Sequence, residues 1–318
     1  KNNMLNQKQK LINLAQRIIA SKGYLQTVTW SFSDSKVDNL FATSSKEIKV
    51  SNPISSDLDV LRRSIFSNLA ISLKNNLDNN FSEPSLFEVG PIFYGKKPGE
   101  QEIILGGLKT GTISKKNWIE QERPIDIFDI KTEVIKSISE LGIKEKNLVV
   151  SNKTQNYYHP GKSGSVNLYS ENGPQLAIFG EIHPAIIQKL NFKNNNLLGF
   201  EIFLQNFSHS LKKYREIRDQ YNISSFQKTE RDFAFIIDKK FSSNVLVNLI
   251  QKIDEILIQD VKVFDVYEGE KVPDDKKSIA LNVTIQAYDK TLNEKDLENL
   301  CQKIINAVKN ATGAELRS

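Results

Sequence analysis

The stretch that decides the fold runs from Val263 to Gln286 and reads VFDVYEGEKVPDDKKSIALNVTIQ. Two runs of alternating apolar and polar residues flank a loop that is dense in charge. Such alternation is typical of half-buried strands, and a polar loop between two strands indicates a hairpin. Gly269 ends the first strand, and Pro273 with Asp274 turns the chain. The sequence therefore predicts an antiparallel hairpin, whose loop is either a binding loop or a solvated tip.

The segments around this hairpin complete a known arrangement. A strand at 232–237 and a helix at 242–256 precede it, its own strands cover 261–267 and 278–286, and a helix at 294–310 and a short end follow. The order β-α-β-β-α-β is the ferredoxin-like arrangement. It leaves one face of its sheet open, and RNA is one of the many ligands that such sheets bind.

The first two thirds of the chain contain many strands and few helices. Helices are expected at Gln7–Lys22, at Asp57–Asn76 and in the segment that Gly142 ends, and an alternating strand is expected at Gln26–Phe32. This pattern favours an antiparallel α+β domain over alternating parallel units. The helices Gln7–Lys22 and Asp57–Asn76 carry more apolar side chains than one core needs, so an exposed apolar patch is expected.

A polar, charged stretch, SHSLKKYREIRDQYNISSFQKTE, separates the two parts. We therefore predict a domain at 1–205, a linker at 206–224 and a ferredoxin-like domain at 225–318. The net charge is +5, but the residues from Arg215 onward hold 16 basic and 18 acidic side chains, so the positive excess lies in the first domain. Any phosphate-binding patch in the second domain would have to be local.

The composition indicates an intracellular, soluble class of protein. Cys301 is the only cysteine, so no disulfide framework or thiolate zinc site can form, and a reducing compartment is the default. No apolar run approaches the roughly 20 residues that span a bilayer, and the N-terminus does not read as a signal peptide. The chain begins with Lys1 and its only methionine is Met4, so a piece of a longer chain is expected.

Catalytic motifs are not found. There is no G-x-S-x-G elbow, no phosphate-binding G-x-x-x-x-G-K-[ST] loop, no G-x-G-x-x-G and no metal-ligand spacing, so we assign no catalytic and no metal residues. A hydrolase that uses His159 stays open, and it would require His159 in a cleft beside a carboxylate. The segment HPGKSG at 159–164 is read as a turn rather than a phosphate site.

Glu88, in the segment FEVG, raises a sharper question. Class II aminoacyl-tRNA synthetases hold ATP with an arginine and a glutamate around a strand–loop–strand. Here the following loop offers only Lys96 and Lys97, and Arg62 and Arg63 are expected on the preceding helix. Binding a triphosphate requires fixed arginine forks. We therefore expect Glu88 to be a buried or edge carboxylate in a domain that does not catalyse.

The second domain offers candidates for nucleic-acid binding. They are Arg231, Phe233, Phe235, Tyr267, Lys276 and Lys277. Arg231, at the start of a strand, forms either a surface ion pair or a phosphate contact. The aromatic residues could stack on bases, although alternation places only half of the strand residues on the open face. The two lysines either contact an RNA backbone or keep the hairpin tip soluble, and Lys277 is favoured because it begins a strand.

Nine segments occur in an order that identifies a family. They are NPISSDLDVLRRS, LFEVGPIF, HPGKSG, FGEIHP, ERDFAFIID, FDVYEG, KKSIALNVTIQ, KTLNEKDL and GAELR. Together they cover essentially the whole chain, which resembles the C-terminal part of the bacterial phenylalanine–tRNA ligase beta subunit. The family's upstream oligonucleotide-binding-like and editing modules would then be missing.

The resemblance implies different roles for the two domains. The first domain would have the class II synthetase fold without catalysis, and would pack against the catalytic alpha subunit in a two-alpha, two-beta tetramer in the cytoplasm. The second domain would bind the anticodon region of tRNA(Phe). ATP and magnesium would act on the alpha subunit, and no cofactor would bind this chain. The alternative is a stand-alone RNA-binding module with a structural first domain.

The chain departs from the family at the start of the second domain. A proline and two arginines usually precede the aspartate of its first strand. Here Gln227 replaces the proline and Glu230 replaces the first arginine, so only Arg231 remains. This departure puts one electrostatic contact to tRNA in question.

Overall fold

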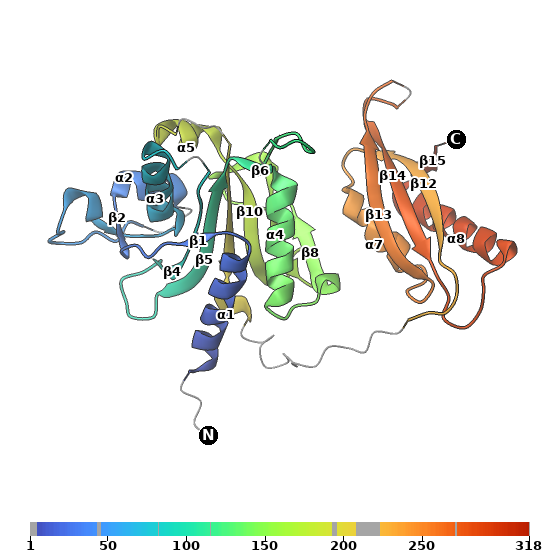
Figure 1. Cartoon of the computed structure of the whole chain (residues 1–318), viewed down its shortest axis with the longest axis horizontal. Coiled ribbons are helices and arrows are strands. Elements are labelled where there is room, and N and C mark those ends of the chain that lie inside the picture. The colour runs from blue at the N-terminus through green and yellow to red at the C-terminus, as the bar shows by residue number, and fades with distance from the viewer. Residues whose placement is uncertain are drawn as a thin grey trace. The chain divides into compact units, whose positions relative to one another are not determined.

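The computed structural model describes residues 5–42, 46–81, 83–114, 116–192, 196–207, 223–270 and 272–317. The chain divides into two compact units, unit 1 (Lys1–Glu216) and unit 2 (Ile217–Ser318) (Figure 1). Of the linker expected at 206–224, residues 208–222 lie outside the described residues.

A seven-stranded sheet forms the centre of unit 1, as the sequence predicts for an antiparallel α+β domain. Its strands lie in the order β1-β4-β5-β11-β10-β9-β8. Only the β1–β4 pair is parallel within this sheet. The strands are β1 (Leu25–Gln26), β4 (Ser85–Phe93), β5 (Gln101–Thr110), β8 (Leu148–Ser151), β9 (Tyr158–Leu168), β10 (Gln175–Ile182) and β11 (Leu197–Phe203).

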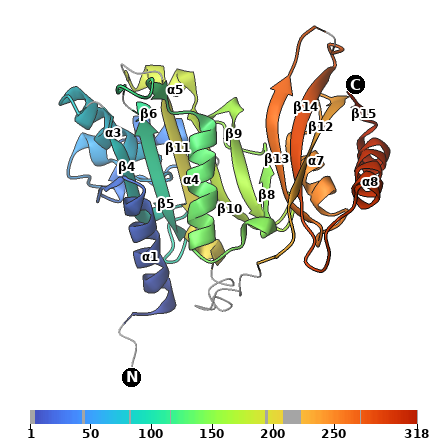
Figure 2. The ribbon, with the colours of Figure 1, turned by 45° about the vertical axis from the view of Figure 1, so that its right-hand side comes forward.

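Helices cover both faces of this sheet. They are α1 (Gln7–Ser21), α2 (Ser35–Phe41), α3 (Phe66–Asp78), α4 (Ile127–Glu140) and α5 (Pro184–Lys189). Helices α1 and α4 pack on one face, and α4 lies across the near side of the sheet in Figures 1 and 2. Helices α2, α3 and α5 pack on the other. Strand alternation divides the core accordingly, so that Phe200 of β11 points into the first cluster and Leu197 into the second.

Two short hairpin-like pairs complete unit 1, and they correct two expectations. They are β2 (Phe32–Ser33) with β3 (Val60–Leu61), and β6 (Thr112–Ser114) with β7 (Arg123–Pro124). The helix expected at Asp57–Asn76 begins only at Phe66, because the residues before it pair with β2. The strand expected at Gln26–Phe32 is interrupted, because the Thr29 amide donates to the Glu88 side chain instead of a neighbouring strand.

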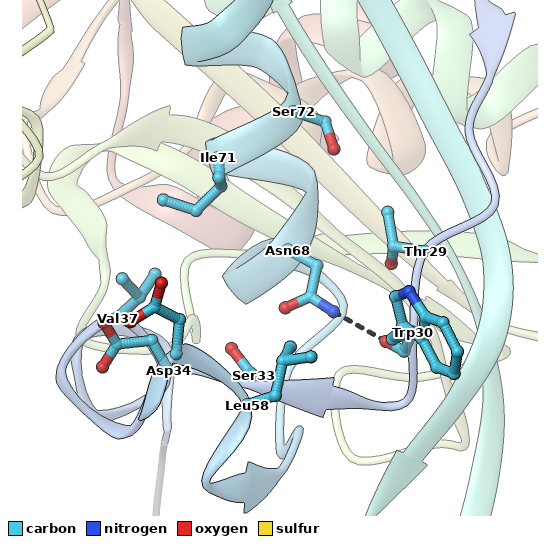
Figure 3. A pocket seen from close by; sticks show the side chains of 10 residues that line it. Thr29, Trp30, Ser33, Asp34, Val37, Leu58, Asn68, Ile71 and Ser72 are labelled. Carbon is cyan, nitrogen blue, oxygen red and sulfur yellow. Dashed lines mark hydrogen bonds between the residues drawn. The ribbon is translucent and has the colours of Figure 1, made fainter. Parts of the chain in front are cut away.

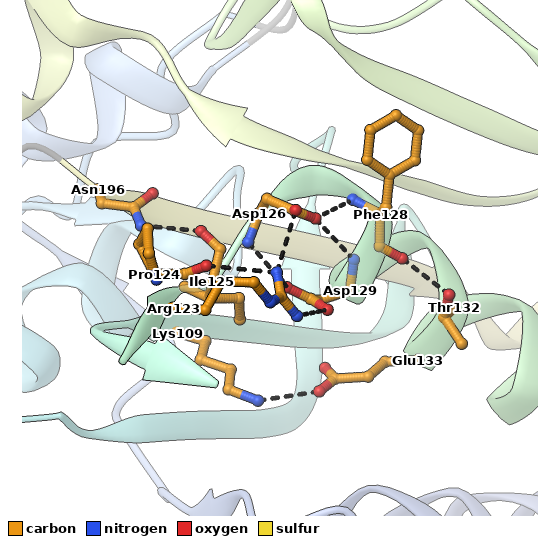
Figure 4. Close-up of polar contacts among 10 residues, drawn as sticks. All are labelled: Lys109, Arg123, Pro124, Ile125, Asp126, Phe128, Asp129, Thr132, Glu133 and Asn196. Atoms are coloured by element: carbon orange, nitrogen blue, oxygen red, sulfur yellow. Dashed lines mark hydrogen bonds and ion pairs between the residues drawn. The ribbon is translucent and has the colours of Figure 1, made fainter. Parts of the chain in front are cut away.

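The N-terminus of α4 is fixed by ion pairs (Figure 4). Asp126 caps the helix and accepts hydrogen bonds from the amides of Phe128 and Asp129. Arg123 of β7 pairs with both Asp126 and Asp129, at 3.1 and 2.7 Å. The hydrogen bond from Arg123 lowers the pKa of Asp129. These contacts join the β6–β7 pair to α4.

Unit 2 has the predicted ferredoxin-like order. Its elements are β12 (Thr229–Asp238), α7 (Ser243–Gln251), β13 (Ile258–Tyr267), β14 (Lys276–Ile285), α8 (Glu294–Thr312) and β15 (Glu315–Leu316). The sheet order is β13-β14-β12-β15, and both helices lie on one side of it (Figure 2). Helix α7 is shorter than expected. Among the described residues of the chain, no helix combines the length and apolarity needed to cross a membrane.

Candidate functional site

The face of the unit 2 sheet that points away from α7 and α8 is here called the open face. Core residues of β12 and β14, such as Phe235 and Ile279, are at most 1% exposed and point toward the helices. Their neighbours along each strand therefore form the open face. These are Glu230, Asp232, Ala234, Ile236 and Asp238 on β12, and Lys276, Ser278, Ala280, Asn282 and Thr284 on β14.

Phe233 and Phe235 do not lie on the open face. They are 6% and 1% exposed, stack on each other with ring centroids 6.0 Å apart, and belong to the core beneath the helices. A base cannot stack on rings that the protein already covers, so the expectation of base stacking by this pair is corrected. The sequence held the signal, because Phe233, Phe235 and Ile237 alternate as one apolar stripe.

Arg231 and Lys277 also lie on the helix side. Arg231 pairs in register with Val283, and Lys277 with Ile237, and both partners are core residues. The Lys277 ammonium donates to the Lys239 carbonyl at 3.3 Å. The expectation that these two side chains begin strands on the open face is therefore corrected. Lys276 pairs with Asp238 and does lie on the open face.

Tyr267 lies at one end of the open face, opposite Ser278. The Arg317 guanidinium lies over its ring, 5.3 Å from the centroid, and donates to the Ser278 hydroxyl at 3.4 Å. Arg317 reaches this place because its amide donates to the Ala234 carbonyl next to β15. The Tyr267 ring is partly exposed. Sequence reasoning missed Arg317, although it ends the GAELR segment. The strand that brings it to Tyr267, β15, has only two residues, and so short a strand has no recognisable sequence pattern.

In unit 1, Glu88 is the buried carboxylate that the sequence predicts. It lies on β4, is 3% exposed, and accepts a hydrogen bond from Arg62 at 2.8 Å. Arg62 is 1% exposed and also donates to the Pro91 carbonyl and the Thr29 hydroxyl. Gly90 leaves the room for this guanidinium, because a Cβ there would lie 2.2 Å from it. Arg62 is thus held inside the protein and cannot reach a nucleotide in this arrangement.

Arg63 is held as firmly as Arg62. Its guanidinium donates to Asp38 at 2.7 Å, and its amide donates to the same carboxylate at 2.9 Å. Asp38 is fully buried and also accepts from Ser67 at 2.9 Å. The expectation that Arg62 and Arg63 lie on a helix is corrected, since both precede α3. Both arginines serve to attach this segment to the body of unit 1.

Glu201 is a second buried carboxylate on the same face of the sheet as Glu88. It lies on β11 opposite Gly106 of β5, and Gly106 lies opposite Glu88. The Tyr157 hydroxyl donates to it at 2.5 Å. Burial raises the pKa of Glu201 from 4.5 to about 7, and the hydrogen bond from Tyr157 offsets only part of this rise. Glu201 therefore holds a proton in the folded chain at mildly acidic pH.

Glu201 gives unit 1 a defined pH dependence of stability. The unfolded chain loses this proton near pH 4.5, whereas the folded chain keeps it until about pH 7. Between these values the unfolded state binds fewer protons, so the free energy of unfolding falls as pH rises, by about 3 kcal/mol in all, and then levels off. Glu201→Gln should remove this component, and Glu171→Gln, at an exposed turn, should keep it. Hydrogen exchange of β11 peptides from pH 5 to 8, corrected for the pH dependence of the intrinsic exchange rates, measures this free energy. If the free energy of unfolding has the same slope against pH in wild type, Glu201→Gln and Glu171→Gln, the assignment to Glu201 is contradicted.

An apolar surface surrounds Trp30. Val28 and Trp30 are 88% and 65% exposed, because Thr29 between them points inward to Arg62 and Glu88. Trp30 borders a pocket of about 340 Å³, whose apolar lining includes Leu58 and Ile71 (Figure 3). The Asn68 side chain holds the backbone in place by donating to the Trp30 carbonyl at 2.6 Å. We call Val28, Trp30, Ile71 and this pocket the Trp30 surface.

The HPGKSG segment begins β9 and does not form a free loop. Lys162 pairs with Glu181 at 2.8 Å, and the His159 ring accepts a hydrogen bond from the Gly161 amide at 3.1 Å. Both side chains thus have local structural partners. The expectation of a turn is therefore corrected, because the segment is the first part of strand β9.

Comparisons with known proteins match both units. The family model of the phenylalanyl tRNA synthetase beta chain CLM domain matches residues 1–204, and that of the ferredoxin-fold anticodon binding domain matches residues 224–317. The phenylalanine–tRNA ligase beta subunit of Paramagnetospirillum magneticum is 38% identical over 302 residues, which are 95% of this chain and 37% of that protein. The corresponding subunit of Rhodospirillum rubrum is 36% identical over 98% of this chain and 38% of its own length.

A solved structure of a Desulfitobacterium hafniense pyrrolysyl tRNA synthetase aligns with a TM-score of 0.45 and 13% identity, over 62% of this chain and 66% of that one. That likeness is too low to support a conclusion. The chain spans less than two fifths of the length of the beta subunits named above. Both family models match in the order that the nine sequence segments indicate. The chain therefore belongs to the family of phenylalanyl-tRNA synthetase beta chains.

Proposed function

We propose that this chain acts as part of a phenylalanine–tRNA ligase, in which unit 1 packs against a catalytic alpha subunit and unit 2 binds the anticodon region of tRNA(Phe). The observation that carries the proposal is the succession of the two family matches, at 1–204 and 224–317. The assembly would contain two alpha and two beta subunits in the cytoplasm. ATP, magnesium and phenylalanine would bind the alpha subunit.

The interior of unit 1 supports a role without catalysis. Arg62 and Arg63, which precede α3, are both bound to buried carboxylates. Over Gly106, between Glu88 and Glu201, the side chain of Ile65 packs so closely that a Cβ would lie 2.2 Å from it. The sheet face that carries Glu88 is thus filled by side chains where a substrate would need space.

The Trp30 surface is the part of unit 1 that best fits an alpha subunit. Large apolar side chains of this exposure are rare outside interaction sites when they gather around one pocket. Tryptophan in such a place is the residue type that most often dominates binding energy. The inward contacts of Thr29 with Arg62 and Glu88 fix the backbone, so little conformational entropy would be lost on association.

The open face of unit 2 fits single-stranded RNA. The part of the Tyr267 ring that Arg317 leaves uncovered offers a surface for a base, and the Arg317 guanidinium over that ring offers a donor for a base or a phosphate. Lys276 adds a positive charge on the same face. A stand-alone RNA-binding module would use the same face, but it would bind tRNA without any alpha subunit.

Removing the Lys276 charge tests the tRNA-binding part of the proposal. Lys276→Ala should weaken binding of a tRNA(Phe) transcript and reduce the slope of log affinity against log salt by about 1, the value for one lost phosphate contact. Lys277→Ala is the matched control, because this side chain bonds the Lys239 carbonyl on the other side. Filter binding at several salt concentrations measures both variants. Equal slopes for wild type and Lys276→Ala would contradict a phosphate contact there.

A further inference from the structure

A second polar feature lies on the open face, apart from Tyr267 and Arg317. Asp232 of β12, Asn282 of β14 and Lys262 of β13 form one row across three strands. The Asn282 amide nitrogen donates to Asp232 Oδ1 at 2.7 Å, and this bond fixes both side chains. Asp232 and Lys262 are exposed, and Asn282 is half-buried.

The row presents hydrogen-bond acceptors without partners. Within the described part of the chain, no group donates to Asp232 Oδ2 or to Asn282 Oδ1. Lys262 is paired with Asp260 at 3.0 Å and does not neutralise Asp232. A carboxylate on an RNA-binding face repels phosphates, so this one is useful there only if it accepts a specific hydrogen bond.

On β12 and β14 the floor between the row and Tyr267 carries small side chains, and Asp265 of β13 lies at its edge, opposite Ala280. Ala234 and Ala280 lie opposite each other, midway between the Ser278 and Asn282 positions. Ser278 and Asn282 are four residues apart, which corresponds to about 13 Å along a strand. Small side chains on these two strands leave room for a base to lie flat beside a base that would stack on Tyr267.

We propose that Asp232 and Asn282 form an acceptor site for the exocyclic amino group of one anticodon base, and that this site contributes to anticodon specificity. Carboxylate and amide oxygens accept hydrogen bonds from such amino groups. The anticodon complementary to the phenylalanine codons UUU and UUC is GAA, in which every base carries an exocyclic amino group, whereas uracil carries none. The inference rests on the function proposed above.

Loss of the Asp232 carboxylate should change the affinity for tRNA in opposite directions, depending on whether Asp232 is an acceptor site or only a surface charge. If Asp232 is only a surface charge, Asp232→Ala reduces repulsion and strengthens tRNA binding at low salt. If Asp232 accepts a hydrogen bond from a base, the same change weakens binding by about tenfold, within the range for one base contact. Glu230→Ala removes an equal charge two residues earlier on the same face.

The experiment uses the whole chain with an unmodified tRNA(Phe) transcript and three variants, each lacking one anticodon amino group. These carry inosine at the first anticodon position, or purine riboside at the second or the third. Wild type and Glu230→Ala should bind one of the three about tenfold more weakly than the parent. Asp232→Ala should bind the parent about tenfold more weakly than wild type does and lose that discrimination.

The experiment distinguishes failure of the acceptor site from failure of the proposed tRNA binding. If wild type binds the transcript, but Asp232→Ala binds it equally or more tightly, or keeps the discrimination, the acceptor site is refuted and the proposed tRNA binding stands. If wild type does not bind the transcript at all, both proposals fail. Circular dichroism of each variant shows that its fold is retained, as the exposure of Asp232 leads us to expect.

Discussion

Arg62→Met is expected to lower the free energy of unfolding of unit 1 by about 3–5 kcal/mol, the range for breaking a buried ion pair by removing one partner. The Arg62 guanidinium and the Glu88 carboxylate lie 2.8 Å apart, and their side chains are 1% and 4% exposed. Without Arg62, the Glu88 charge stays buried and, among the described residues, keeps only the hydrogen bonds from the Thr29 hydroxyl and amide. The Pro91 carbonyl also loses the hydrogen bond that Arg62 donates.

The double variant Arg62→Met with Glu88→Leu distinguishes charge from packing. Apolar replacement of both partners of a buried ion pair is often neutral or stabilising, so the double variant should recover most of the loss. Hydrogen exchange of β4 and β5 peptides measures the stability of unit 1, and peptides of β14 in unit 2 serve as an internal reference. A single variant as stable as wild type, or a double variant less stable than the single, would contradict this account of the ion pair.

Trp30→Asp should weaken association with the alpha subunit by about 30-fold or more, because truncation of a central interface tryptophan costs 2 kcal/mol or more. Trp30 is 65% exposed in this chain, so the substitution should leave the fold of unit 1 intact. The aspartate would place a charge beside the apolar lining of the pocket, where Leu58 and Ile71 lie. Titration of labelled alpha subunit with each variant measures the affinity.

Trp118→Asp is the matched control for that experiment. Trp118 is the other tryptophan of the chain and is 93% exposed, between β6 and β7. If the alpha subunit binds through the Trp30 surface, Trp118→Asp should keep wild-type affinity. Equal losses from both substitutions would mean that the effect is not specific to the Trp30 surface, and no loss from either would place the interface elsewhere.

The fold of unit 2 could be read from sequence because its signals are local. The alternation in Val263–Gln286 and the charged loop within it define the β13–β14 hairpin, which the structure confirms at Ile258–Tyr267 and Lys276–Ile285. The start of α3 could not be read in this way. The residues before Phe66 have helical spacing, but β3 pairs with β2, and Arg62 and Arg63 bind carboxylates that are distant in sequence.

The site was less predictable than the fold. Tyr267 and Lys276 lie on the open face. Alternation along each strand places Arg231 on the side of Phe233, and Lys277 on the side of Ile279, so the sequence already held the signal for these two residues. The proximity of Arg317 to Tyr267 depends on β15, which has two residues. Likewise, the hydrogen bond from Asn282 to Asp232 joins residues 50 positions apart. Such contacts follow from tertiary pairing, which a single sequence does not specify.

The charged loop between Tyr267 and Ser278 has a defined place in unit 2. It connects β13 and β14 as a hairpin tip. Lys276 and Lys277 differ, because Lys276 lies on the open face and Lys277 bonds the Lys239 carbonyl. Of these two lysines, Lys276 is therefore the one expected to contribute to tRNA binding.

The central claim is that this chain assists a catalytic partner and does not itself activate phenylalanine. The most direct test is phenylalanine-dependent pyrophosphate exchange by the purified chain, alone and after co-purification with the alpha subunit. The account predicts a stable complex with the alpha subunit, exchange only when that subunit is present, and no exchange by the chain alone. Exchange by the chain without an alpha subunit, or a folded chain that fails to bind it, would contradict the account.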